Sequence, residues 1–215
     1  LGEIPFGRYY GSIDATPLFV VLAGSYYLRT GDVEFIRGLW QHIEAALAWI
    51  DDYGDIDRDG FVEYERRSET GLIQQGWKDS YDSIFHANGD LAEPPIALSE
   101  VQGYVYAAKK FGGELARVLG RGQHAERLHQ QADSLKAQFN SVFWIPELRT
   151  YALALDGRKK PCRVRTSNAG QCLFGGIADV TSAEAVSRTL MTEQSFSGWG
   201  IRTVAEGESR YNPMS

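Results

Sequence analysis

Cysteine is scarce in this sequence, which contains only Cys162 and Cys172 among its 215 residues. Two cysteines are too few for a disulfide framework, and their spacing matches no common zinc motif. We therefore interpret both as small buried side chains or free thiols. This usage favours a reducing compartment, no signal peptide is visible, and we expect a cytoplasmic location.

Long apolar runs and an excess of basic residues are also missing. The sequence has no run of about 18 apolar residues, which argues against a membrane partner. Its 22 Lys and Arg against 28 Asp and Glu give a net charge of −6. That balance argues against a nucleic-acid partner, because phosphates attract a basic surface. The 43% of hydrophobic residues is enough to bury a core, which excludes a disordered chain.

Apolar residues recur with a helical period in the first part of the chain. From Val33 to Ile50 they step by three and four residues, which predicts a helix with Asp32 as its N-cap. A helix is also expected over 15–28. Its buried stripe is predicted to consist of Leu18, Leu22 and Tyr26.

The same period predicts helices over 98–115 and 125–142, and shorter ones over 169–176 and 182–191. Inner apolar helices alternate with outer amphipathic ones, so the sequence indicates an all-α fold of stacked helical hairpins. Small β-hairpin insertions are expected, with strands at 60–64 and 150–155. The long connection over 51–93 is where function is expected, because long loops on rigid scaffolds often carry it.

This connection contains an acidic D-x-D-x-D-G motif. Asp55, Asp57 and Asp59 fall at positions 1, 3 and 5 of an EF-hand calcium loop, and Glu63 falls at position 9. Position 12, which should be a bidentate Glu, is Arg66. The pattern leaves two readings open, an acidic turn before a hairpin and a calcium site.

A Trp77-Lys78-Asp79 motif follows in the same connection. Asp79 could cap a short helix running to Ile84. Alternatively it could be a general acid, because a carboxyl group beside aromatic rings loses hydration and its pKa rises.

Several polar and aromatic residues near the starts of the helices form a further candidate set. Its members are Tyr10, Asp14, Gln75, Trp77, Glu100, Gln102 and Tyr104. They could be helix caps and solvent-exposed side chains, or they could form a sugar pocket in which amides and carboxylates grip hydroxyls. The four histidines form no ligand pair, and we expect no metal site among them.

Five stretches of this sequence resemble the glycogen debranching enzyme-like amylo-α-1,6-glucosidases, most of all their bacterial members. They are RYYGSIDATPLF (8–19), GFVEY (60–64), QGWKDS (75–80), PIALSEVQGYVYAA (95–108) and FSGWGIRT (196–203). The resemblance implies an (α/α)6 toroid of the six-hairpin glycosidase type. It also implies inverting hydrolysis of α-linked glucosides, with an α-glucan or gluco-oligosaccharide substrate and no cofactor.

The aspartate that serves as the general acid in that family falls on Asp79. The family's substrate contacts would fall on Tyr10, Asp14, Glu63, Tyr64, Trp77, Lys78, Glu100 and Gln102. From the polar set above, Gln75 is also expected to bind substrate. Gln171 stands where relatives usually carry His, so one local contact is expected to differ.

Length sets a limit on what this chain can contain. Twelve helices with their loops need about 350 residues, so residues 1–215 are expected to be the N-terminal part of a single catalytic domain. The general base, a glutamate in the family, is then expected beyond residue 215, and this part alone is expected to be inactive and to self-associate. Three other functions stay open: a non-catalytic carbohydrate-binding toroid, a helical-repeat scaffold and a calcium-stabilised structural domain.

Overall fold

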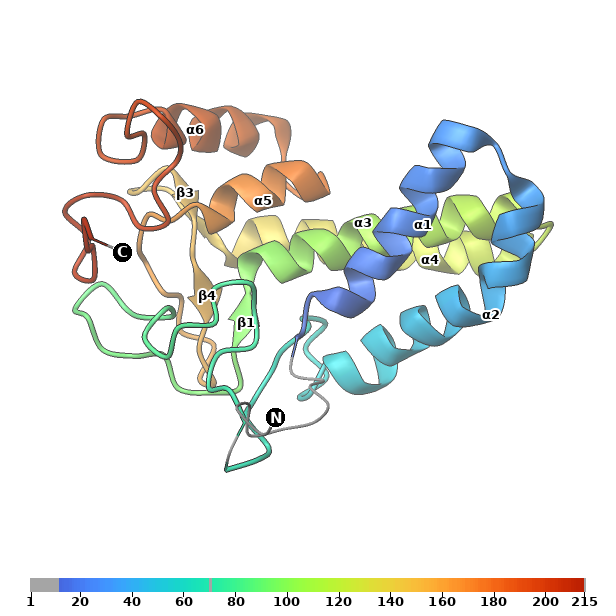
Figure 1. The fold of residues 1–215 in the computed structure, drawn as a ribbon, viewed down its shortest axis with the longest axis horizontal. Coiled ribbons are helices and arrows are strands. Elements are labelled where there is room, and N and C mark those ends of the chain that lie inside the picture. The colour runs from blue at the N-terminus through green and yellow to red at the C-terminus, as the bar shows by residue number, and fades with distance from the viewer. Residues whose placement is uncertain (1–11, 70, 215) are drawn as a thin grey trace, which may run out of the picture.

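The computed structural model describes residues 12–69 and 71–214 and confirms the predicted all-α class (Figure 1). Within these residues the α-helices are α1 (Ala15–Thr30), α2 (Val33–Trp49), α3 (Ser99–Val118), α4 (Gly122–Val142), α5 (Asn168–Gly175) and α6 (Val180–Leu190). A short π-helix, η1 (Ile50–Gly54), continues α2. Each helix lies within a few residues of its predicted position.

The helices pair in chain order, and α3 is the centre of the arrangement. It packs against α1, α4 and α5, while α2 packs against α1 and α6 against α5 (Figure 1). Most of α3 is buried, whereas α2 and α4 each bury one face. The chain therefore has inner helices α1, α3 and α5 and outer helices α2, α4 and α6, as the alternation in the sequence predicts.

The turn between α1 and α2 is formed by the residues that the sequence indicates. Gly31 ends α1 in the left-handed conformation with φ of 66°. The side chain of Asp32 then accepts a hydrogen bond from the backbone N–H of Phe35, which confirms the predicted N-cap of α2. The apolar face of α2 buries Ile36 and Ile43 completely.

The predicted buried stripe of α1 is wrong. Leu22 is 69% exposed, whereas Val20, Val21 and Ala23 are buried. Helix α1 carries apolar residues around most of its circumference, so periodicity alone does not say which side faces α2 and α3. Small residues settle the choice, because the backbone of Gly24 lies directly against the Phe111 ring of α3.

The strands are short and form two separate pairs. Strand β1 (Ala97–Leu98) pairs antiparallel with β4 (Ala154–Leu155), and β2 (Trp144–Ile145) pairs antiparallel with β3 (Thr150–Tyr151). The single strand predicted over 150–155 is therefore divided between two partners. The strand predicted over 60–64 is reduced to an isolated bridge between Tyr64 and Ile96.

Helices α3 and α5 cross at a point where their backbones nearly touch. A Cβ atom built on Gly175 would lie 2.6 Å from the carbonyl carbon and oxygen of Gly103. Only glycine at position 175 leaves room for this approach, which sets the position of α5 against α3.

Both cysteines are free and buried, as predicted. Burial raises the pKa of Cys162 to about 12 and also raises that of Cys172, so neither thiol is activated. In the part of the chain that the structure describes, no helix is long and apolar enough to cross a membrane.

Candidate active site

The three inner helices begin next to the same group of loops (Figure 1). A polar residue lies within two positions of the start of each helix. Asp14 precedes α1, Glu100 lies in the first turn of α3, and Asn168 is the first residue of α5. All three side chains are buried. Their charges and dipoles act on one another, because Asp14 and Asn168 both shift the pKa of Glu100.

Glu100 is the most enclosed acid of this group. Its residue is 1% exposed, and Oε2 has no hydrogen-bond partner among the described residues. Burial raises the pKa of Glu100 to about 7; the side chain of Asn168 and the ammonium of Lys78 oppose the rise, and Asp14 adds to it. Glu100 can therefore be protonated near neutral pH and donate a hydrogen bond.

Lys78 brings a positive charge of the long connection close enough to Glu100 for the two charges to act on each other. Its Nζ donates to the carbonyl oxygen of Thr203 at 2.6 Å and lies 5.1 Å from the centroid of the Trp77 ring. Burial lowers the pKa of Lys78, and the carboxylate of Glu100 opposes that shift. The lysine is thus a partly desolvated cation beside a buried carboxyl group.

The five stretches of the family resemblance converge on this region. The backbone N–H of Ile13 donates to the carbonyl oxygen of Gln75 at 2.9 Å. A Cβ atom on Gly76 would lie 3.7 Å from a carboxyl oxygen of Glu100. The bridge of Tyr64 with Ile96 and the bond of Lys78 with Thr203 bring in the remaining two stretches. Segments up to 125 residues apart in sequence therefore meet near the helix N-termini.

Asp79 is exposed in the described part of the chain, and so is Trp77, at 44%. The Asp79 carboxyl group was expected to lose hydration beside the Trp77 indole, but the described residues leave both side chains exposed. No helix runs from Asp79 to Ile84, so the helix-cap reading of Asp79 is wrong. Asp79 directly follows Lys78, which places its backbone at the edge of the group around Glu100.

The side chain of Gln102, which was expected to contact the sugar, makes hydrogen bonds to backbone groups in the structure. Its side-chain amide donates to the carbonyl oxygens of Val62 at 2.8 Å and Leu98 at 3.0 Å, and Oε1 accepts from the N–H of Val62 at 2.9 Å. Residues two apart on a helix point in different directions, so Gln102 does not share the side of Glu100. The amide is completely buried and ties the 60–64 segment to α3.

Two further predicted contacts, Glu63 and Tyr64, are buried in side-chain networks. The hydroxyl of Tyr64 donates to Gln74, and Glu63 pairs with Lys159. Gln75 is half-buried, and its side-chain amide donates to the carbonyl oxygen of Glu65 at 3.3 Å. The structure thus brings together Asp14, Lys78 and Glu100 but gives these others structural partners.

Tyr10 lies outside the described residues. Tyr104 is buried beside the acids, and its pKa is raised by burial and then by the charges of Glu100 and Asp14. Sequence reasoning missed Asn168 and Lys159 as site residues. The segment around Asn168 was visible as a helix start and as the place where Gln171 replaces the usual His of relatives, and nothing local to Lys159 indicates its partners.

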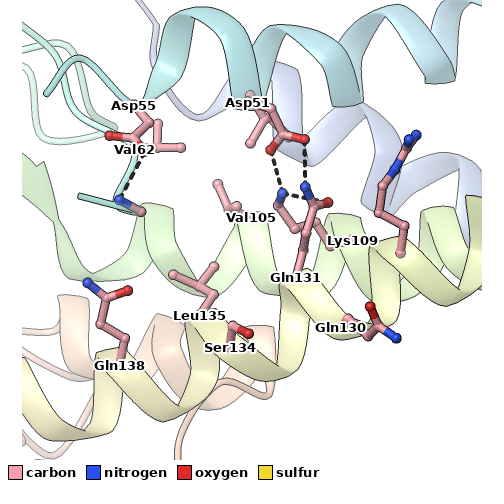
Figure 2. Close-up of a pocket in the computed structure, with 13 residues that line it drawn as sticks. Asp51, Asp55, Val62, Val105, Lys109, Gln130, Gln131, Ser134, Leu135 and Gln138 are labelled. Carbon is pink, nitrogen blue, oxygen red and sulfur yellow. Dashed lines mark hydrogen bonds and ion pairs between the residues drawn. The ribbon is translucent and has the colours of Figure 1, made fainter. Parts of the chain in front are cut away.

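A pocket of about 440 Å³ lies elsewhere, between η1 and helices α3 and α4 (Figure 2). Asp51 pairs with Lys109 at 2.5 Å and accepts from Gln131 at 3.1 Å, while Lys109 also donates to Gln131 at 3.1 Å. These polar groups satisfy one another. The pocket contains none of the residues predicted to bind substrate, although Asp55 of the acidic loop lies at its edge.

Replacing Glu100 by Gln is expected to change how stability depends on pH. Because the folded pKa of Glu100 is above its ordinary 4.5, the folded state holds this proton more tightly than the unfolded state. The wild-type free energy of unfolding should therefore fall, relative to Glu100→Gln, as pH rises from about 4.5 to about 7. Between pH 5 and pH 8, the free energy of unfolding of Glu100→Gln should therefore rise by about 1–3 kcal/mol relative to that of wild type.

Urea unfolding at the two pH values measures this difference. Glu126→Gln, at an exposed position of α4, is the matched control and should show none of it. If Glu100→Gln and wild type differ in free energy of unfolding by the same amount at pH 5 and pH 8, the raised pKa of Glu100 is contradicted.

Comparison with solved structures supports the fold. A GH63 mannosylglycerate hydrolase from Thermus thermophilus matches with a TM-score of 0.68 at 14% identity, over 96% of this chain and 60% of that one. An uncharacterized conserved protein from Thermus thermophilus matches with a TM-score of 0.67 at 17% identity, over 96% and 61%. A GH78 family rhamnosidase of Bacillus sp. GL1 matches with a TM-score of 0.64 at 16% identity, over 83% and 17%.

These neighbours confirm the six-hairpin (α/α)6 architecture, of which this chain contains a part. The chain spans less than two thirds of the length of each of them. That residues 1–215 are the N-terminal part of a single catalytic domain stays a prediction.

Sequence comparison gives one family. The model of the mannosylglycerate hydrolase MGH1-like glycoside hydrolase domain matches residues 9–215. No curated protein matches the sequence. The match supports the expected glycoside hydrolase, whereas the more specific likeness to amylo-α-1,6-glucosidases and glycogen debranching is not confirmed.

Proposed function

The chain belongs to the MGH1-like glycoside hydrolase domain family, and we propose that it carries the general-acid side of an inverting glycosidase site. The observation that supports this most is the convergence of five separated sequence stretches on the N-termini of α1, α3 and α5. The buried polar side chains of Asp14, Glu100 and Asn168 collect at that point, with the half-buried ammonium of Lys78 near them.

In the proposed mechanism Asp79 protonates the departing glycosidic oxygen. Its exposed side chain is then free to reach a substrate, while Lys78, which precedes it in the chain, and Glu100 bind and orient the sugar. A second carboxylate removes a proton from the attacking water on the opposite face of the sugar. Inversion requires about 6.5–9.5 Å between the two carboxyl groups. We expect that second group in the rest of the whole protein.

The substrate class we propose is an α-linked glycoside. An α-1,6-glucosidic bond in a gluco-oligosaccharide is the first candidate, because of the motif resemblance. Mannosylglycerate is the second, because the matched family and one Thermus thermophilus neighbour carry that name. The partly desolvated ammonium of Lys78 could pair with a substrate carboxylate, which favours testing a glycoside of an organic acid.

A panel of substrates tests this proposal on the complete protein. Isomaltose, panose, maltose and mannosylglycerate are each incubated with the enzyme, and the anomer released first is followed by proton NMR. We expect α-linked substrates to be cleaved and the β-anomer to appear first. Release of the α-anomer would contradict inversion, and binding without turnover would instead indicate a carbohydrate-binding toroid.

Self-association of this chain on its own stays a prediction. Leu22 and Leu28 of α1 are 69% and 70% exposed, and they give the apolar surface through which copies would associate.

A further inference from the structure

Helices α3 and α5 run in the same direction from starts that lie next to the same loops (Figure 1). Their closest approach is around Gly103, where an added Cβ atom would lie 3.4 Å from Cα of Cys172. One helical turn back from this crossing, Asn168 at the start of α5 comes to lie beside Ser99 and Glu100 at the start of α3. The packing of the two helices therefore places an amide against the buried acid.

Four side chains at this place have buried polar atoms without a hydrogen-bond partner among the described residues. The atoms are Oγ of Ser99, Oε2 of Glu100, Oγ of Ser167, and both Nδ2 and Oδ1 of Asn168. Asn168 is 0% exposed and Glu100 is 1% exposed. A buried polar atom without a partner is costly, so an apolar side chain at position 168 would serve packing at least as well. The amide of Asn168 therefore indicates a function other than stabilising the fold.

Asn168 is too deeply buried to touch a substrate, but Glu100 extends farther. Its second carboxyl oxygen, Oε1, lies 3.7 Å from a Cβ atom added to Gly76 in the long connection. The carboxyl group thus has one oxygen enclosed in the protein and the other facing the loop that carries Lys78. Any effect of Asn168 on a substrate must pass through Glu100.

Groups from each element packed against Glu100 act on its proton. Burial raises the pKa of Glu100, the side chain of Asn168 is the strongest opposing influence, Lys78 also opposes the rise, and Asp14 adds to it. Tyr104 on the same helix and Cys172 on α5 are neutral, because burial raises the pKa of each. A donor that lowers the pKa of an acid does so by stabilising the carboxylate.

We propose that Asn168 is a positioning residue that acts through Glu100: its buried amide donates to the carboxylate and keeps the other oxygen turned toward the sugar. The bond to Oε2 is completed by movement of either side chain or through one bridging water, since neither atom has a partner in this structure. When Glu100 is protonated, it donates to Oδ1 instead, because an amide offers both a donor and an acceptor. The benefit to sugar binding rests on the proposed function, whereas the coupling of the two side chains does not.

Four forms of the complete protein test the coupling: wild type, Glu100→Gln, Asn168→Leu and the double variant. Urea unfolding is measured from pH 5 to pH 9.5, and each protein is compared with its Glu100→Gln partner. Because the folded pKa of Glu100 lies above 4.5, wild type loses stability relative to Glu100→Gln as pH rises, and the difference should level off just above pH 7. Without the amide it should level off at least about one pH unit higher, since leucine cannot stabilise the carboxylate.

Two controls make the result specific. Lys78, whose pKa is lowered to about 8, is present in all four proteins and titrates in both pairs. Gln102→Leu removes another buried amide, one that bonds to the backbone of Val62 and Leu98. It should lose stability at every pH and leave the levelling-off of the Glu100 difference where it is. If Asn168→Leu does not fold, Asn168→Asp replaces it, and the second carboxylate should also move the levelling-off to higher pH.

Kinetics on the complete enzyme give the second readout. An increase of one unit in the pKa of Glu100 leaves about fivefold less carboxylate at pH 7 and nearly the same amount at pH 9. Asn168→Leu should therefore lower kcat/KM by about fivefold at pH 7, and the loss should largely disappear at pH 9. A difference that levels off at the same pH with and without Asn168 overturns the proposal. A shifted levelling-off in a protein that cleaves no glycoside supports the coupling and contradicts only the proposed function.

Discussion

Asp79→Asn in the complete enzyme is expected to lower kcat by about 10²–10⁴-fold, the usual contribution of a general acid. The amide has the size of the carboxyl group but cannot give up a proton, so the glycosidic oxygen must leave as an alkoxide. KM should change much less, because Lys78 and Glu100 would still bind the sugar. Steady-state kinetics on the substrate cleaved best in the panel measures both effects.

Changing the leaving group of the substrate makes this experiment more specific. A glycosyl fluoride needs little protonation to depart, so Asp79→Asn should slow its hydrolysis far less than that of a disaccharide. A carboxyl group that only oriented the substrate would slow both alike. Asp82→Asn, in the same loop, is the control, because Asp82 faces Arg210 at 3.5 Å. A disaccharide rate for Asp79→Asn within tenfold of wild type would remove Asp79 from the role.

Gly175→Ala should be strongly destabilising although it adds a single methyl group. The new Cβ would lie 2.6 Å from the backbone of Gly103, and backbone cannot rotate away as a side chain can. Helices α3 and α5 would have to separate, with an expected loss of about 1–3 kcal/mol or more in the free energy of unfolding. Because the crossing also positions Asn168 against Glu100, activity of the folded fraction should fall as well.

Gly38→Ala is the matched control for this prediction. Gly38 lies within α2, and a Cβ there would meet nothing within 4 Å. Alanine should therefore stabilise the helix by about 0.5–1 kcal/mol. Urea unfolding of both variants measures the contrast. Equal stability of Gly175→Ala and wild type would show that the two helices do not approach as closely as described.

The sequence predicted the helices well because their signals are local. The step of three and four residues from Val33, the cap at Asp32 and the turn at Gly31 act within one or two helical turns. The buried side of α1 was predicted wrongly, since which apolar stripe is covered depends on where the neighbouring helices lie. The small size of Gly24, which admits Phe111, was the relevant signal.

The sequence predicted only part of the candidate site, because the side chains there are positioned by contacts between distant segments. Motif likeness identified Asp14, Lys78 and Glu100, which the structure brings together. The same likeness also included Gln102, whose hydrogen bonds to Val62 could not be read from sequence. Lys159 was missed because its partners lie up to 102 residues away, in a loop whose own pattern already suggested a metal.

A crystal structure of the complete enzyme carrying Asp79→Asn, with its uncleaved substrate bound, tests the central claim most directly. We predict that the scissile oxygen lies within hydrogen-bond distance of Asn at position 79, with the sugar ring held between Lys78 and Glu100 at the starts of α1, α3 and α5. A sugar bound instead in the pocket of Asp51, Lys109 and Gln131 would contradict this location of the active site.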